Sequence, residues 1–195
     1  MHVKQLKNIC MMKTMMISMM MFLTALASEA QVMTSATVTN LYEKVTTSGG
    51  NGFVYNAEYN DRGDIIAMDV YLKSVQNKDV VRLVPSCRYQ YAYAEDGLLI
   101  SRMLYGWRHG KWQLRGRHDY QLADGLYTVE YSRWNRKKNR YDQACGMMTY
   151  NLLPDESVMH VACYSRHRED APMELEWQSV VERQFADADY YLTKE

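Results

Sequence analysis

Residues 105–125 read YGWRHGKWQLRGRHDYQLADG. From Trp112 to Leu122, every second position holds Trp, Leu, Gly, His, Tyr or Leu, and the positions between them hold only charged or amide side chains. This period of two predicts a β-strand with one face toward a core. The pairs His109-Gly110 and Asp124-Gly125 bound the strand, and such pairs favour tight turns because glycine takes a positive φ at no steric cost. The segment therefore predicts two successive β-hairpins.

The first of these hairpins has a defined register. If His109-Gly110 is a two-residue loop, Trp107 lies opposite Trp112 and Tyr105 lies opposite Leu114; histidine tolerates positive φ better than most residues. Two interpretations of the tryptophan pair remain open. The rings form either a platform for sugar stacking or part of the hairpin core. Trp107 and Trp112 are accordingly candidate ligand-binding residues.

The same alternation recurs along the chain, at residues 53–59, 89–93 and 173–177, with Gly-containing turn signals between the runs. We expect an all-β protein, an antiparallel meander of about nine or ten strands built from hairpin units, as a curved sheet or a two-sheet sandwich. Helical spacing occurs only near the C-terminus, where residues 185–195 are expected to form a helical turn or a tail.

A tyrosine precedes a predicted turn at four places, Tyr59, Tyr93, Tyr131 and Tyr164. The similar spacing between them fits duplicated two-strand units that stack on one another, and it fits equally a simple meander with tyrosine at strand ends.

The first thirty residues differ from the rest. Lys4, Lys7 and Lys13 precede an apolar run over residues 14–27, and small residues follow up to Ala30. This order is typical of a secretory signal peptide. We therefore expect residues 1–30 to be removed and residues 31–195 to form a single β domain, exported to the periplasm or the cell exterior, or associated with the cell surface. No second long apolar segment follows, so no stable membrane span is expected after signal removal.

Export would permit disulfide formation. If the hairpin near residues 152–156 is centred on Pro154, Cys145 lies opposite Cys163 and Tyr150 lies opposite Val158. The two cysteines could then form a disulfide or remain a reduced pair. Cys87 is left over.

The familiar catalytic motifs are missing. The sequence holds no Cys-x-x-Cys, no pair of histidines with helical zinc spacing in residues 31–195, no Gly-x-Ser-x-Gly and no glycine-rich phosphate or dinucleotide loop. We expect no metal, no cofactor and no catalytic residue. The favoured function is a non-enzymatic binding or surface-interaction module. The alternative is a small periplasmic hydrolase or inhibitor with a site assembled from distant strands.

Charge is balanced overall, with 23 basic and 23 acidic residues, which argues against a nucleic-acid partner. The balance is uneven locally, because residues 102–140 are strongly basic and residues 141–195 strongly acidic. Arg136, Lys137, Lys138 and Arg140 form the densest basic cluster. They are candidates for binding an anionic ligand such as an acidic glycan, or they are neutralised by neighbouring parts of the sheet. The partners we consider are a glycan or another surface protein.

Several of these features together resemble a family of small exported proteins of gut anaerobic bacteria that is known only as a domain of unknown function. The resemblance includes the signal peptide, the tyrosine-rich turn at 55–63, the tryptophan hairpin at 105–112 and the Tyr-Ser-Arg-Trp-Asn run at 131–135. It covers most of residues 40–185. The resemblance implies an all-antiparallel β fold and carries over no activity and no catalytic residue.

Overall fold

The computed structural model describes residues 32–47, 52–77, 80–151 and 158–182. The predicted signal peptide and the predicted C-terminal helical turn lie outside these residues. The elements are α2 (Ser35–Thr47), β1 (Phe53–Tyr59), β2 (Ile65–Asn77), β3 (Val80–Tyr93), β4 (Leu99–Arg108), β5 (Lys111–Ala123), β6 (Leu126–Asn135), β7 (Arg140–Tyr141), β8 (Gly146–Asn151), β9 (Val158–Ser165) and β10 (Glu174–Glu182).

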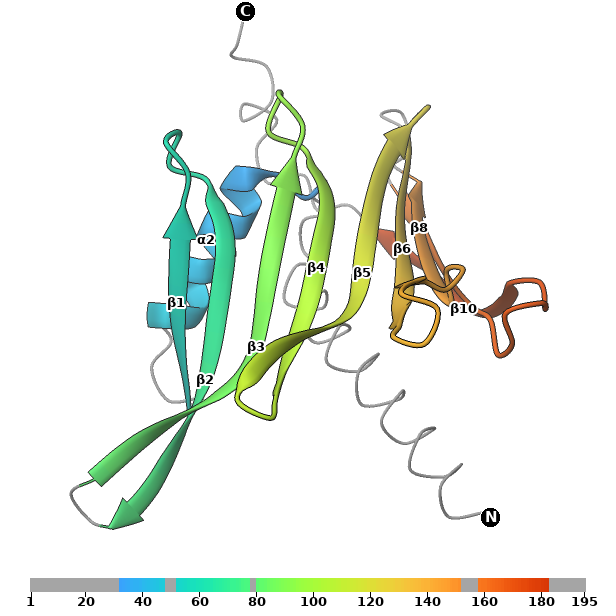
Figure 1. The fold of residues 1–195 in the computed structure, drawn as a ribbon. Helices are drawn as coiled ribbons and strands as arrows, with labels where there is room; N and C mark the ends of the chain where they lie inside the picture. The colour runs from blue at the N-terminus through green and yellow to red at the C-terminus, as the bar shows by residue number, and fades with distance from the viewer. Residues whose placement is uncertain (1–31, 48–51, 78–79, 152–157, 183–195) are drawn as a thin grey trace, which may run out of the picture.

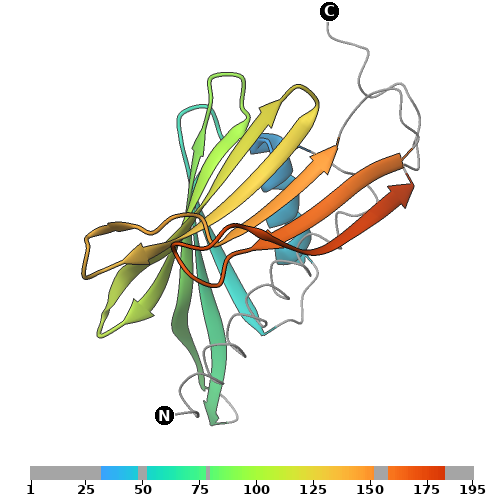
Figure 2. The same ribbon diagram turned by 90° about the vertical axis from the view of Figure 1, so that its right-hand side faces the viewer.

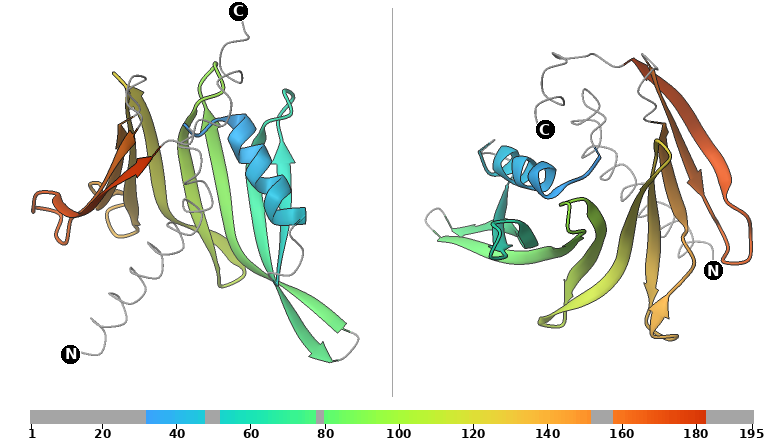
Figure 3. Two further views of the ribbon diagram at one scale, coloured as in Figure 1. Left: turned by 180° about the vertical axis from the view of Figure 1, so that it is seen from behind. Right: turned by 90° about the horizontal axis from the view of Figure 1, so that it is seen from above.

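The strands form one ten-stranded antiparallel sheet (Figure 1). Neighbours in the sheet follow chain order, β1-β2-β3-β4-β5-β6-β8-β9-β10, and the short β7 pairs with β6 alone. The sheet curves strongly, so that it has a concave and a convex face (Figure 3). The expected all-β meander is thus confirmed, in its curved-sheet form.

Helix α2 lies on the concave face, against the first strands of the sheet (Figure 2). Its N-terminus is capped by Thr34, whose Oγ1 accepts a hydrogen bond from the backbone N–H of Thr37 at 3.1 Å. Val38 packs with Ile65 of β2 and Leu99 of β4 in a buried cluster. The sequence analysis missed this helix because its many threonines have low helix propensity, and packing on the sheet compensates for that.

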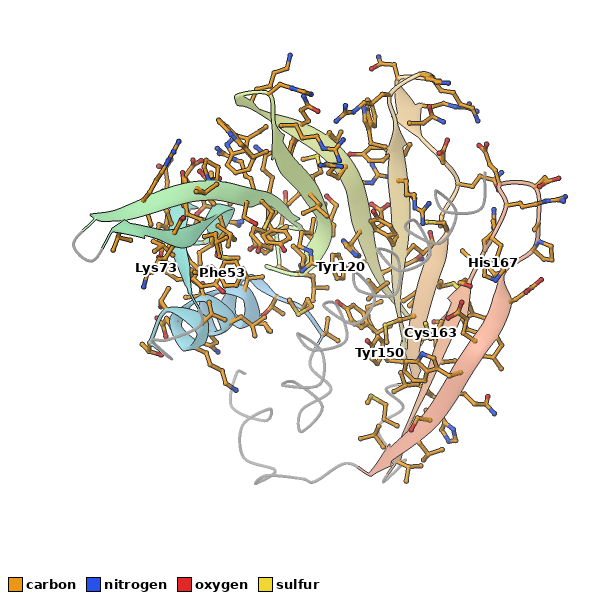
Figure 4. All side chains as sticks on the ribbon, turned by 90° about the horizontal axis from the view of Figure 1, so that it is seen from below. Phe53, Lys73, Tyr120, Tyr150, Cys163 and His167 are labelled. Carbon is orange, nitrogen blue, oxygen red and sulfur yellow. The ribbon has the colours of Figure 1, made fainter. Side chains whose placement is uncertain are left out.

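Residues opposite each other in a sheet share a face. Tyr120 packs in the cluster beneath α2 and therefore lies on the concave face. It pairs with Val129, which pairs in turn with Met148. Met148 pairs with Cys163, so the second buried cluster, Met148, Met159, Val161 and Cys163, also lies on the concave face. Figure 4 shows Tyr120, Tyr150 and Cys163 on this side of the sheet.

The β4–β5 hairpin has the predicted register. His109 and Gly110 both adopt positive φ, 51° and 73°, as a tight hairpin turn requires. Trp107 pairs with Trp112, and Tyr105 pairs with Leu114.

The predicted register of the β8–β9 pair is wrong by three residues. Tyr150 pairs with Val161 rather than Val158, and Cys163 pairs with Met148 rather than Cys145. The predicted register would have set Met148 opposite His160, which is exposed, whereas the observed one keeps apolar side chains on the buried face. Among the described residues, all three cysteines, Cys87, Cys145 and Cys163, are free thiols.

The tyrosine repeat does not mark duplicated two-strand units. Tyr59 and Tyr93 lie at the ends of β1 and β3. Tyr131 lies in the middle of β6 and Tyr164 near the end of β9, and both of these strands run in the opposite direction. The chain is a simple meander.

Alternation of strand direction brings the turns at 109–110, 136–139 and 166–173 to one end of the sheet, called here the lower end (Figure 1). None of the helices among the described residues is both long and apolar enough to cross a membrane.

Candidate binding site

The two predicted tryptophans lie at the lower end, on the convex face. Trp107 and Trp112 meet edge to face, with ring centroids 4.9 Å apart and planes at 73°. Trp107 keeps 37% of its surface exposed. The convex placement follows from strand alternation, because the adjacent Gly106 pairs with Cys87 on the concave face.

A second aromatic pair lies on the neighbouring β6–β7 hairpin. Trp134 and Tyr141 are cross-strand partners whose centroids lie 5.0 Å apart at 74°. The Arg117 guanidinium lies over the Tyr141 ring at 4.6 Å, and its charge is balanced by Asp119, with Nε 2.9 Å from Oδ1. Trp134, Tyr141 and Arg117 were not among the predicted site residues, because only the pairing of β6 with β5 and β7 sets them beside the first pair.

Tyr105 connects the two aromatic pairs. It lies two residues before Trp107 on the same face of β4, and it interacts electrostatically with Tyr141. Its hydroxyl donates a hydrogen bond to Gln90 Oε1 at 2.7 Å. The lower convex face thus carries five aromatic side chains, which we call the aromatic patch: Tyr105, Trp107, Trp112, Trp134 and Tyr141.

Cations crowd the rim around the aromatic patch, where Arg136 of the β6–β7 turn reaches Gln113 of the β4–β5 hairpin. Burial, together with Arg108 and Arg136, lowers the pKa of the Arg115 guanidinium. Within the described part of the chain, the exposed rim cations without a carboxylate at ion-pair distance are Arg108, Lys111, Arg136, Lys137 and Arg140. Arg115 lies against Gly106 on the opposite face of the sheet.

The predicted basic cluster divides into paired and unpaired members. Lys138 Nζ lies 2.6 Å from Glu169 Oε2 and 3.8 Å from Asp142 Oδ1, so its charge is neutralised. Arg136 donates a hydrogen bond to Gln113 Oε1 of β5, which ties the loop to the neighbouring hairpin. Lys137 and Arg140 are exposed. Lys138 therefore fits the neutralised interpretation, whereas Arg136, Lys137 and Arg140 have no carboxylate at ion-pair distance among the described residues.

The cysteines lie apart from the aromatic patch. Cys145 lines a small pocket of about 110 Å³ between β6 and the 166–169 loop, together with Arg133 and Arg166. Burial raises the pKa of the Cys87, Cys145 and Cys163 thiols. A nucleophilic cysteine needs the opposite shift.

The four histidines in the described residues are dispersed over the structure. His109 is in a turn, His118 is buried on β5, His160 is exposed on β9 and His167 is in a loop. In the part of the chain that the structure describes, no three His, Cys, Asp or Glu side chains gather in a group that could hold a metal ion.

Comparison with known proteins identifies the family. A model of a family of unknown function, DUF3836, matches residues 32–152, more than half of the chain. The chain belongs to the DUF3836 family. The matched segment contains α2 and the strands β1 to β8, including the whole aromatic patch.

Three solved structures are similar to this chain. A protein of unknown function from Bacteroides fragilis is 20% identical, with a TM-score of 0.56 over 69% of this chain and 95% of that one. Two DUF3836 proteins are also similar. The one from Bacteroides vulgatus is 20% identical, with a TM-score of 0.41 over 47% of this chain and 89% of that one. The one from Parabacteroides distasonis is 25% identical, with a TM-score of 0.39 over 47% of this chain and 83% of that one. No curated protein matches the chain.

Proposed function

We propose that this DUF3836 protein is an exported, non-enzymatic binding module that takes an acidic polysaccharide at the lower end of its sheet. The observation that carries the proposal is the aromatic patch, with its two edge-to-face pairs at 4.9 and 5.0 Å, bordered by cations without carboxylate partners in the described residues. Export rests on the basic, apolar and small-residue order of residues 1–30.

The chemistry of the site fits a polymer with both rings and negative charges. Aromatic rings such as Trp107 offer a flat apolar surface to the C–H face of a sugar ring. Arginine forks such as those of Arg136 and Arg140 bind carboxylate or sulfate groups by charge-assisted hydrogen bonds. A neutral glycan would leave these cations without partners, and a simple anion would leave the rings unused.

The described thiols do not suit a cysteine hydrolase at this surface. The three described thiols are protonated at neutral pH because burial raises their pKa, and they lie away from the aromatic patch. Binding without turnover is therefore the simpler use of this surface.

The test is binding of polygalacturonate at low salt, with dextran as the neutral polymer. We expect the purified protein to bind polygalacturonate and not dextran, with affinity that falls as salt screens the exposed charges. Combined replacement of Arg136, Lys137 and Arg140 by glutamine should weaken binding at least about tenfold, since charge-assisted bonds contribute most of the specific affinity.

The matched control replaces Lys44, Arg62 and Lys73 by glutamine, which removes the same charge far from the patch. This variant should bind as the unaltered protein does. Equal weakening by both triple variants, or no binding of polygalacturonate even at low salt, would refute the proposed site.

A further inference from the structure

Arg102 occupies the centre of the concave face, on the opposite side of the sheet from the aromatic patch. It lies on β4 between Tyr91 of β3 and His118 of β5, its cross-strand partners. Its guanidinium lies over the Tyr89 ring at 5.4 Å, and its Nη2 is 3.5 Å from His118 Nδ1. The Nε atom is buried and has no hydrogen-bond partner. Among the described residues, no carboxylate lies within ion-pair distance of Arg102.

The groups around Arg102 carry no compensating charge. Burial raises the pKa of the phenols of Tyr89, Tyr91, Tyr120 and Tyr127, so all four are neutral at physiological pH. Burial and the Arg102 charge lower the pKa of His118 well below its usual value, so this imidazole is neutral as well. Arg102 is always protonated and is therefore a cation among neutral rings, an arrangement that is unfavourable without a counter-ion.

The concave face beyond Arg102 is apolar. Met148, Val161 and Cys163 continue it across β8 and β9, with Trp177 of β10 packed against them. Helix α2 covers the β1–β3 side of this face (Figure 3). A hollow of about 230 Å³ adjoins Tyr120 and Tyr127 and is otherwise lined mainly by apolar side chains such as Leu99 and Leu122.

We propose that Arg102 binds the carboxylate of a small organic acid whose apolar body lies along the concave face. The charge of the acid complements the lone cation, and its apolar body matches the Tyr, Met and Val surface beside it. The hydroxyls of Tyr91 and Tyr120, which interact electrostatically with Arg102, are further donors beside it. This site is separate from the aromatic patch and does not depend on it.

The probe is dodecanoate, used below its micelle-forming concentration and measured by calorimetry, with dodecanol as the same body without the charge. We expect dodecanoate to bind at least about tenfold more tightly than dodecanol, since hydrogen bonds to a charged group account for a difference of that order. Arg102→Met should abolish this preference. Arg82→Met, which removes an exposed cation from β3, should retain it.

Two further variants guard against loss of folding in Arg102→Met. Arg102→Lys keeps the charge but loses the planar fork, and it should bind dodecanoate with intermediate affinity. Tyr120→Phe should weaken dodecanoate but not dodecanol. The proposal fails if dodecanoate does not bind, if dodecanol binds equally well, or if folded Arg102→Met binds dodecanoate like the unaltered protein. Retained binding of polygalacturonate by Arg102→Met would show that the two sites are distinct.

Discussion

Arg88 and Arg102 lie on adjacent strands of the same sheet and face opposite sides of it. On the convex face, Arg88 lies 2.8 Å from Glu58 Oε1 and 3.6 Å from Asp69 Oδ1. On the concave face, Arg102 meets tyrosine rings and a neutral imidazole. The comparison shows that one sheet can use the same side chain in two ways: as half of an ion pair on one face and as an uncompensated charge on the other.

A clear contrast between a buried and an exposed position falls on two adjacent isoleucines of β2. Ile65 is 0% exposed beneath α2, and Ile66, the extra residue of a bulge in β2, is 38% exposed. Ile65→Ala should lower the free energy of unfolding by about 2–5 kcal/mol, because it leaves a cavity under the helix. Ile66→Ala should cost less than about 1 kcal/mol. Chemical denaturation of both variants measures the difference, and similar losses would show that α2 does not cover this part of the sheet.

The arginine comparison predicts effects of opposite sign. Arg88→Met should lower the free energy of unfolding by about 1–3 kcal/mol, because it leaves the buried Asp69 carboxylate without its cation. Arg102→Met, measured without ligand, should raise it by about 1 kcal/mol, since a buried charge is replaced by an apolar side chain. Urea denaturation of the two variants tests this, and a large loss of stability in Arg102→Met would mean that the cation is needed for folding.

The concave face should also respond to pH. The groups around His118 are Arg102 of β4, Tyr131 of β6 and Tyr120 of its own strand. Its pKa in the folded state lies well below the unfolded value of 6.5, so the unfolded chain binds more protons as the pH falls below 6.5. Stability should therefore drop by about 1.4 kcal/mol per pH unit below that value, until the folded pKa is reached.

The matched variant for this prediction is His118→Gln. Comparing its free energy of unfolding at pH 7 and pH 5.5 with that of the unaltered protein isolates the histidine. The unaltered protein should lose more stability than the variant over this interval. An equal loss would place the pH response elsewhere in the molecule.

The smallest effect is expected at the tip of the aromatic patch. Trp107→Ala removes one ring of a cross-strand pair at an exposed position and should cost only about 0.2–1 kcal/mol of stability. Binding of polygalacturonate should nevertheless weaken several-fold if the ring stacks on sugar. Circular dichroism melts and binding titrations of one sample separate the two effects, and a large loss of stability with unchanged binding would assign Trp107 to the hairpin core.

Local patterns were sufficient for the hairpins. The His109-Gly110 turn determined the pairing of Trp107 with Trp112, because a two-residue loop leaves only one register. The β8–β9 register was mispredicted, because no such pair of turn residues marks its centre and the buried face of Met148 and Cys163 sets the pairing instead. Helix α2 was missed for a related reason: its stability comes from contacts with Ile65 and Leu99, which are distant in sequence.

The sequence by itself determined the strand content, the chain-order meander and the aromatic and basic residues of the β4–β5 and β6–β7 hairpins, since period-two alternation and turn chemistry are local properties. Only the tertiary structure decided which side chains of each strand lie on the concave face of the sheet. The curvature of the sheet and the pairing of its strands bring Trp134 and Tyr141 beside the tryptophan hairpin. They also set Arg102 among tyrosines from three other strands. Such placements depend on pairings between strands far apart in the chain, and no local pattern encodes them.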